Sequence, residues 1–244
     1  MKNILIFIFF IFALVAFQYA KGQTVDDIIN QYIAARGGND KLASIQSLYL
    51  EGTREIMGNE VQLKETRVNG KLYRVDFSMG SNTGYTIITP DKGWTYFPMR
   101  SDQATEIPAE RLKMMQGQLD IQGPLVDYQQ KGYKATLLGQ DTVNGKEAWK
   151  IQLTDSLGAD LTFFLDTTTH LLVKRIQVVS FQGRRNGAGP REAITDYGDY
   201  KSFDGILFPQ TINTEGSGMG AGAMYFDTIK VNPPVDEKLY KPEN

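Results

Sequence analysis

The sequence has no cysteine, one histidine (His170) and two tryptophans among its 244 residues. The lack of cysteine excludes disulfide bonds, thiolate zinc sites and a lipobox cysteine that could be acylated. A single histidine also excludes metal sites built from several histidines. A Ser–His–Asp triad would have to use His170, which follows three threonines in a polar turn, and the chain has no G-x-S-x-G elbow. We therefore interpret His170 as a solvent-facing turn residue.

An excess of positive charge is also missing. The 26 Lys and Arg residues are outnumbered by 28 Asp and Glu, which gives a formal net charge of −2 and argues against a nucleic-acid partner. The alternating glycines of residues 216–222 precede no helix, so they predict a mobile loop or a bulged strand rather than a dinucleotide-binding turn. No pattern in the chain indicates a cofactor. With 41% hydrophobic residues, the chain can bury a substantial core.

Long apolar runs are absent except at the N-terminus. Lys2 precedes an unbroken apolar run over residues 4–17, and the small residues Ala20 and Gly22 flank Lys21. The run is short for a membrane span but typical of a secretory signal, and the small residues predict cleavage before Gln23. An uncleaved anchor is the alternative. We expect a signal peptide over residues 1–22 and a single exported domain over residues 23–244, with no lipid anchor and no membrane span.

Helical periodicity occurs in only two regions. Thr24 is a candidate N-cap for a helix that ends at Gly37, and a short second helix follows over residues 39–45. The second region predicts two helices over residues 109–121 and 125–130, separated by Gly123 and Pro124.

The rest of the chain alternates apolar and polar residues with period two. Asn69-Gly70, Asn144-Gly145 and Asp204-Gly205 are hairpin signals between such segments. Long neighbouring segments over residues 161–165, 171–181, 193–201 and 206–213 predict an antiparallel meander. The pattern predicts about eleven strands in a mainly-β α+β fold.

Acidic residues provide weak alternatives for chemistry. Asp196, Asp199 and Asp204 are close in sequence, but their spacing matches no EF-hand loop, so we interpret them as turn and strand-end residues. A pair of carboxylates could serve a secreted glycoside hydrolase, yet nothing in the sequence singles out a pair.

Two segments carry a family resemblance: FFLDTTTHLLVKRI, which starts at Phe163, and DYGDYKSFDGILFPQTI, which starts at Asp196. They resemble the LolA-like outer-membrane lipoprotein-sorting proteins, in particular a divergent secreted branch. Residues 28–52, 88–98 and 137–153 fit the same pattern, so the resemblance covers most of the mature chain. It implies an incomplete, unclosed antiparallel β-barrel with an N-terminal helix and an inserted helical lid over its mouth.

The resemblance further implies a periplasmic carrier that binds lipoprotein acyl chains without chemical turnover. The concave face of the barrel would bind the ligand through Leu48, Leu50, Leu63, Val75, Phe77, Trp94, Tyr96, Trp149, Ile151 and Phe163, with Met114 and Met115 contacting it from the lid. Methionine is pliable and suits variable chains. The chain departs from the family at the arginine that holds the lid closed, since Arg67 and Lys71 are only neighbours of that position.

A filled barrel is the main alternative, because the same residues describe an ordinary β-sheet core. The protein would then be an interaction or stress-sensing module that recognises an envelope protein through an edge strand or a basic loop. That loop, residues 183–191, contains Arg184 and Arg185 and could contact a lipid headgroup or an acidic partner. A solvated hairpin tip is the simpler interpretation. We expect a monomer in either case.

Overall fold

The computed structural model describes residues 22–56, 58–98, 100–156, 158–181, 189–216 and 221–243. These residues form one antiparallel sheet in the order β6-β5-β4-β3-β2-β1-β13-β12-β11-β10-β9-β8-β7. The strands are β1 (Ser47–Ile56), β2 (Asn59–Val68), β3 (Leu72–Met79), β4 (Asn82–Ile88), β5 (Gly93–Tyr96), β6 (Thr105–Glu106), β7 (Lys134–Val143), β8 (Lys146–Thr154), β9 (Asp160–Asp166), β10 (Leu172–Phe181), β11 (Gly189–Phe203), β12 (Ile206–Glu215) and β13 (Gly222–Val231).

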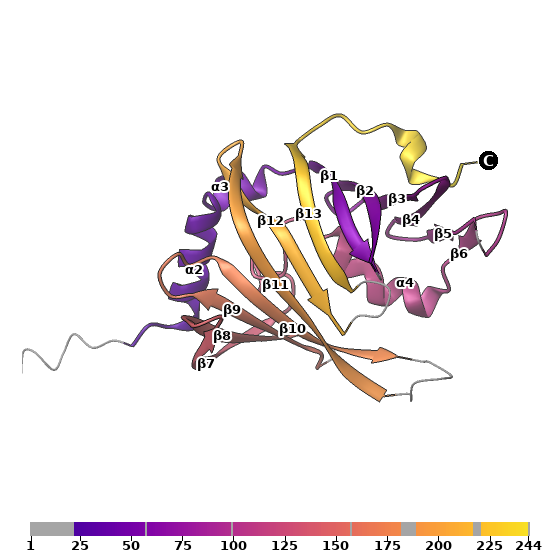
Figure 1. The fold of residues 1–244 in the computed structure, drawn as a ribbon. Coiled ribbons are helices and arrows are strands. Elements are labelled where there is room, and N and C mark those ends of the chain that lie inside the picture. The colour runs from indigo at the N-terminus through magenta and orange to yellow at the C-terminus, as the bar shows by residue number, and fades with distance from the viewer. Residues whose placement is uncertain are drawn as a thin grey trace, which may run out of the picture.

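The sheet consists of two meanders that meet in the middle. The first meander runs from β1 outward to the edge strand β6, and the second returns from the other edge strand, β7, to β13, which pairs with β1. Because β6 and β7 do not pair, the sheet curls without closing (Figure 1). The predicted mainly-β α+β fold with an unclosed barrel is confirmed. The described residues contain thirteen strands rather than about eleven, and the two-residue β6 had no signal in the sequence.

The hairpin signals of the sequence mark real turns. Asn144 and Gly145 have φ values of 51° and 78°, and Asp204 and Gly205 have φ values of 51° and 75°. Two consecutive positive φ values characterise the two-residue turn that matches the twist of a hairpin. These turns fix the register of β7 with β8 and of β11 with β12.

The first predicted helix is confirmed as α2 (Val25–Arg36). Thr24 and Asp27 form a capping box, in which the Thr24 hydroxyl accepts from the Asp27 N–H and the Asp27 carboxylate accepts from the Thr24 N–H. The helix ends at Gly37, whose φ is 130° and where a Cβ atom would lie 2.6 Å from the Gly205 carbonyl oxygen. The short helix α3 (Asn39–Ala43) follows. Both helices lie at the same end of the sheet (Figure 1).

The inserted helical pair is only half confirmed. Residues 109–119 form α4 (Ala109–Met115) and the 3-10 helix η1 (Gln116–Leu119), whereas residues 125–130 form consecutive turns and no helix. The helix prediction for residues 125–130 was wrong because Asp127 adopts a φ of 51°, and a left-handed residue stops helix propagation. Leu125 and Val126 are nevertheless buried, at 2% and 0% exposure. Their apolar side chains therefore pack into the core without forming a helix.

The remaining described element is the 3-10 helix η3 (Glu237–Tyr240), which packs against β3 and β4 (Figure 1). Arg74 links this segment to the sheet. Its guanidinium binds both carboxylate oxygens of Asp76, at 2.7–2.9 Å, and the Glu243 carboxylate at 2.8 Å. None of the helices in the described ranges is both long and apolar enough to cross a bilayer.

Candidate functional site: the concave face of the sheet

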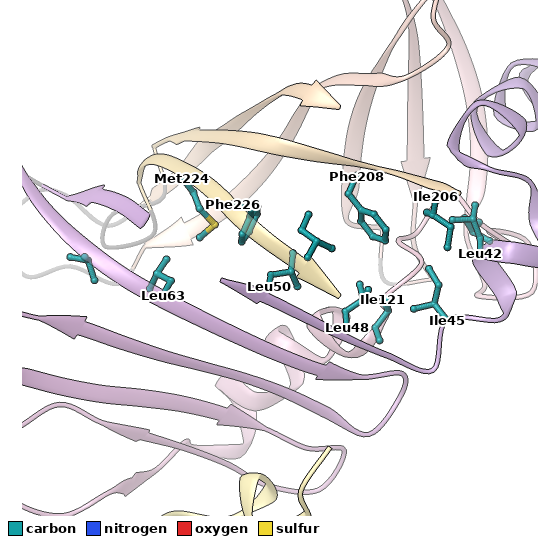
Figure 2. Packing of buried hydrophobic residues seen from close by; sticks show 13 residues of the cluster. Leu42, Ile45, Leu48, Leu50, Leu63, Ile121, Ile206, Phe208, Met224 and Phe226 are labelled. Atoms are coloured by element: carbon teal, nitrogen blue, oxygen red, sulfur yellow. The ribbon is translucent and has the colours of Figure 1, made fainter. Parts of the chain in front are cut away.

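One face of the curled sheet is apolar across most of its strands. A first cluster on this face combines alternate residues of β1, β2, β12 and β13 with residues of the helical segments (Figure 2). Its buried members are Leu42, Ile45, Leu48, Leu50, Val61, Leu63, Ile121, Val126, Ile206, Phe208, Met224, Phe226 and Ile229. We call this the concave face.

The two ends of the concave face are covered differently. At one end, Leu42 and Ile45 lie against Ile206, and Ile121 lies at the same end (Figure 2). Val126 belongs to the same cluster. Leu42, Ile45 and Val126 are fully buried. We call this the covered end.

The other end, near Leu63 and Met224, has apolar side chains that remain half-buried (Figure 2). Phe77 pairs in register with Leu63, and Ile212 pairs with Met224. Phe77 lies over Gly84, where a Cβ atom would come within 2.3 Å of its ring. We call this the open end and define it by the half-buried residues Ile56, Val75, Phe77 and Ile212.

Beneath α2, a second cluster continues the apolar surface on β8, β9 and β10. Ile151 and Phe163 are 0% and 1% exposed there, against Ile28 and Ile29 of α2. Trp149 is half-buried at the margin of this cluster. The helix therefore seals this part of the concave face.

Eight of the predicted ligand-binding residues lie on the concave face. They divide between the first cluster, which contains Leu48, Leu50, Leu63, Val75 and Phe77, and the second, which contains Trp149, Ile151 and Phe163. Ile151 and Phe163 are covered by α2. The half-buried Val75 and Phe77 lie at the open end.

The other four predicted residues lie on β5 and α4. Trp94 and Tyr96 belong to a cluster with Leu239 and Tyr240 on the opposite face of β5, and their placement on the concave face was wrong. Strand alternation explains the error: Gly93, one residue before Trp94, is the position that faces the α4 side. Met115 of α4 packs with Ile88 and Tyr73, on the same face of β3 as Val75 and Phe77, whereas Met114 is 78% exposed. Arg184 and Arg185 lie outside the described residues.

A polar group of side chains interrupts the apolar surface. The Arg67 Nε donates to the buried carboxylate of Glu65, and the Arg67 guanidinium lies 4.9 Å from the centre of the Tyr73 ring. Burial raises the pKa of Tyr73, and the charge of Glu65 raises it further. Burial would lower the pKa of Arg67, but the Glu65 carboxylate outweighs this effect and raises it. Glu65 and Arg67 thus form a paired charge inside the sheet.

The predicted lid is attached to the hairpin that follows Arg67. The Gly70 N–H donates to the Leu119 carbonyl at 2.9 Å, and the Ile121 N–H donates to the Asn69 side-chain oxygen at 3.4 Å. The bonded partner of Arg67 is Glu65, so these hairpin contacts hold the segment instead. The sequence did not reveal them, because the Asn69-Gly70 turn was interpreted only as a hairpin.

The polar turn that contains His170 is a structural unit. Burial acts to raise the pKa of Asp166, but hydrogen bonds from the Thr169 and Thr168 N–H groups outweigh it and lower that pKa. His170 has a φ of 59° and is half-buried, with an unpartnered Nδ1, rather than solvent-facing as expected. The turn folds the ring back against the protein.

The acidic residues that suggested a cation site have separate roles. Asp196 faces Lys174 across the strand pair at 3.7 Å. Asp199 and Asp204 both have a φ of 51°, at a break in the β11 register and in a turn respectively. Within the described ranges, no group of three or more histidines, aspartates and glutamates could hold a metal ion.

Known proteins are similar to this chain in structure but not in sequence. Neither a protein-family model nor a curated protein matches the sequence. A LolA superfamily protein from Nitrosomonas europaea superposes with a TM-score of 0.58 over 91% of this chain and 99% of its own, at 10% identity. The fold is LolA-like.

Two further solved structures agree with this assignment. A DUF1329 family protein from Desulfovibrio piger has a TM-score of 0.57 at 12% identity, covering 90% of this chain and 98% of its own. An outer membrane lipoprotein-sorting protein domain from Vibrio parahaemolyticus has a TM-score of 0.51 at 11% identity, covering 88% of this chain and 94% of its own. At these identities the similarity concerns the fold.

Proposed function

We propose that this protein is an exported, carrier-type binding protein of the cell envelope that holds a hydrophobic ligand without chemical turnover. The ligand class that fits the lipoprotein-sorting fold is the acyl chain of a lipoprotein. In this proposal, residues 1–22 are removed on export and residues 23–244 act in the periplasm as a single domain.

The open end carries this proposal. Val75, Phe77 and Ile212 are apolar and half-buried on a surface whose other end is sealed by α2, α3 and residues 121–126. Each methylene group that an acyl chain buries there would contribute about 0.8 kcal/mol. An apolar surface that its own chain covers only in part is the expected form of a site for an apolar ligand.

The direct test is mass spectrometry of the exported protein. The full chain is expressed in a bacterial host, recovered from the periplasm and purified without detergent. Native and denaturing spectra of one sample are then compared. The proposal predicts cleavage before Gln23 and a bound lipid that is released on denaturation. A clean apo mass, together with no uptake of a fluorescent fatty-acid probe, would refute the binding function.

A pair of variants locates the ligand on the sheet. Ile212 is on the concave face of β12, and Tyr225 is on the neighbouring strand, 51% exposed on the opposite face. Ile212→Trp fills the open end and should reduce probe uptake. Tyr225→Trp introduces the same side chain on the other face and should leave uptake unchanged. Equal uptake by both variants would place the ligand elsewhere.

A filled barrel that binds a protein partner is the second candidate. It is favoured by the covered end, where Leu42, Ile45 and Val126 are 0% exposed. The sheet edge available for such a partner is β7, which includes Leu138 at 48% exposure. In that case the mass spectra show no lipid, and Leu138→Lys abolishes capture of the partner.

A further inference from the structure

Two guanidinium nitrogens on the concave face are buried without an acceptor in the described part of the chain. They are the Nε atoms of Arg54 on β1 and Arg175 on β10. A buried donor without an acceptor costs about 1–3 kcal/mol, more when it is charged, so native structures rarely contain one. Two of them on one surface indicate a missing acceptor.

Strand register places both arginines on the concave face. On β1, Leu50, Gly52 and Arg54 follow one another at intervals of two residues. The Arg54 Nη2 is 4.0 Å from the sulfur of Met224 in the first cluster. Arg175 pairs in register with Phe163, a buried member of the second cluster. Alternation along each strand therefore points both side chains inward.

The two arginines lie at opposite ends of one row of residues. Arg54 pairs with Met224, Met224 pairs with Ile212, and Ile212 pairs with Tyr197. Two residues before Tyr197 is Thr195, which pairs with Arg175. The row thus crosses the open end through the half-buried Ile212.

A third arginine, Arg67, acts on a tyrosine together with Arg175 and on another tyrosine together with Arg54. Burial raises the pKa of Tyr197, while the charges of Arg175 and Arg67 oppose this rise. Burial likewise raises the pKa of Tyr73, and the charges of Arg67 and Arg54 oppose it. Arg67 of β2 therefore lies near Tyr197 of β11, although β2 and β11 do not pair.

Positive charge on this surface exceeds the negative charge that faces it. Arg54, Arg67 and Arg175 share these contacts. The carboxylates that act on them are Glu65, which accepts from Arg67, and Asp120, which is itself paired with Lys131. Burial lowers the pKa of Arg54, which reflects a cation without adequate compensation. Arginine binds carboxylates and phosphates through paired N–H donors.

We infer that Arg54 and Arg175 bind the anionic group, a carboxylate or a phosphate, of an amphiphile whose chain lies on the open end. The anion accepts from the Nε–H of the arginine at either end of the row, and the chain contacts Ile212 and Phe77. The inference rests on the proposed function, because it names the polar end of the same ligand. It identifies the ligand class as anionic amphiphiles rather than neutral lipids.

The test compares three probes by calorimetry on the purified exported protein, below the critical micelle concentration. Laurate carries both the chain and the anion, monolaurin carries the chain without charge, and inorganic phosphate carries the anion alone. The test variant is Arg54→Gln with Arg175→Gln. The control is Lys64→Gln with Lys230→Gln, which removes the same charge from the opposite face, where Lys64 pairs with Glu51 and Lys230 lies over Tyr49.

Wild type and the lysine variant should bind laurate at least about tenfold more tightly than monolaurin, since a charge-assisted hydrogen bond is lost with the neutral probe. The arginine variant should bind both equally, with its monolaurin affinity unchanged. Equal affinities in wild type, or a preference that persists in the arginine variant, would overturn the inference but leave the proposed function standing.

If neither laurate nor monolaurin binds, the proposed function fails and the amphiphile assignment fails with it. If laurate does bind, the phosphate titration distinguishes a site for a free anion from a site for the anionic end of a lipid. Phosphate binding as tight as that of laurate, lost in the arginine variant, would mean that the site takes a free anion and would overturn the lipid assignment. No phosphate binding, with laurate preferred, supports the amphiphile.

Discussion

The covered and open ends of the concave face are built from the same strands with the same alternation, yet they are packed differently. Along β1, Leu48 at the covered end and Leu50 beyond it are buried, while Ile56 at the other end of the strand is only half-buried. The difference comes from α2, α3 and residues 121–126, which lie over one end. A strand pattern therefore defines a face, and a segment distant in sequence decides whether that face is core or binding surface.

The largest difference between the two ends should appear in stability. Leu42→Ala removes a fully buried side chain at the covered end and should lower the free energy of unfolding by about 2–5 kcal/mol, because it leaves a cavity. Ile212→Ala at the open end should cost at most about 1 kcal/mol, since that side chain is already partly in water. Urea unfolding of both variants measures the difference. Equal costs would mean that the open end is closed in solution.

Substituting one arginine at each end should give the next largest difference in stability. Arg36 at the covered end donates to the Leu207 carbonyl at 3.2 Å and to the Tyr32 hydroxyl at 3.1 Å. Arg36→Met should cost about 2 kcal/mol, because both acceptors lose their donor. Arg54→Met at the open end should change stability by less than about 0.5 kcal/mol or increase it, since its Nε has no acceptor. A loss at Arg54 as large as that at Arg36 would show that Arg54 is a structural residue.

The helix that covers the concave face should be weakened by a single hydroxyl. Thr24→Ala removes the N-cap of α2 and should lower stability by about 1 kcal/mol. Amide hydrogen exchange should rise in α2 more than in β12 or β13. Thr24→Ser keeps the capping oxygen and serves as the control. Unchanged exchange in the alanine variant would mean that packing of Ile28 and Ile29 alone holds the helix.

The smallest expected effect is the pH dependence of the stability that Asp166 provides in the turn between β9 and β10. The folded-state pKa of Asp166 is lower than its unfolded value of about 3.9, so the ionised carboxylate stabilises the fold above that pH. This contribution is lost as the pH falls through the folded-state pKa. Wild type should therefore be more stable than Asp166→Asn at pH 7, and the gap should shrink in acid. A gap that is independent of pH would contradict this account.

Much of the fold could be predicted because its signals are local. Asn144-Gly145 and Asp204-Gly205 specify their turns through positive φ values, and Thr24 with Asp27 caps α2 within one helical turn. Residues 125–130 could not be assigned correctly, because their apolar pattern suits a helix as well as a packed turn. Asp127 takes a left-handed conformation only in the context of the surrounding contacts.

The candidate site was predictable only as a set of apolar positions. Val75 and Phe77 on β3 share a face by alternation, and both pack against the first cluster of the concave face. Trp94 and Tyr96 were assigned to it wrongly, because a two-fold pattern defines two faces without saying which one is inside. The arginines at positions 54 and 175 gave no signal, since their row exists only through the pairing of three intervening strands.

By itself, the sequence determined the strand periodicity, the turns, the cap of the first helix and the absence of cysteine and histidine chemistry. These properties depend on residues within a few positions of one another. The tertiary structure decided which end of the concave face is covered, which arginines remain without an acceptor, and how β1 meets β13. Those properties depend on contacts between residues far apart in the chain, whose geometry is fixed only when the sheet curls and the helical segments pack against it.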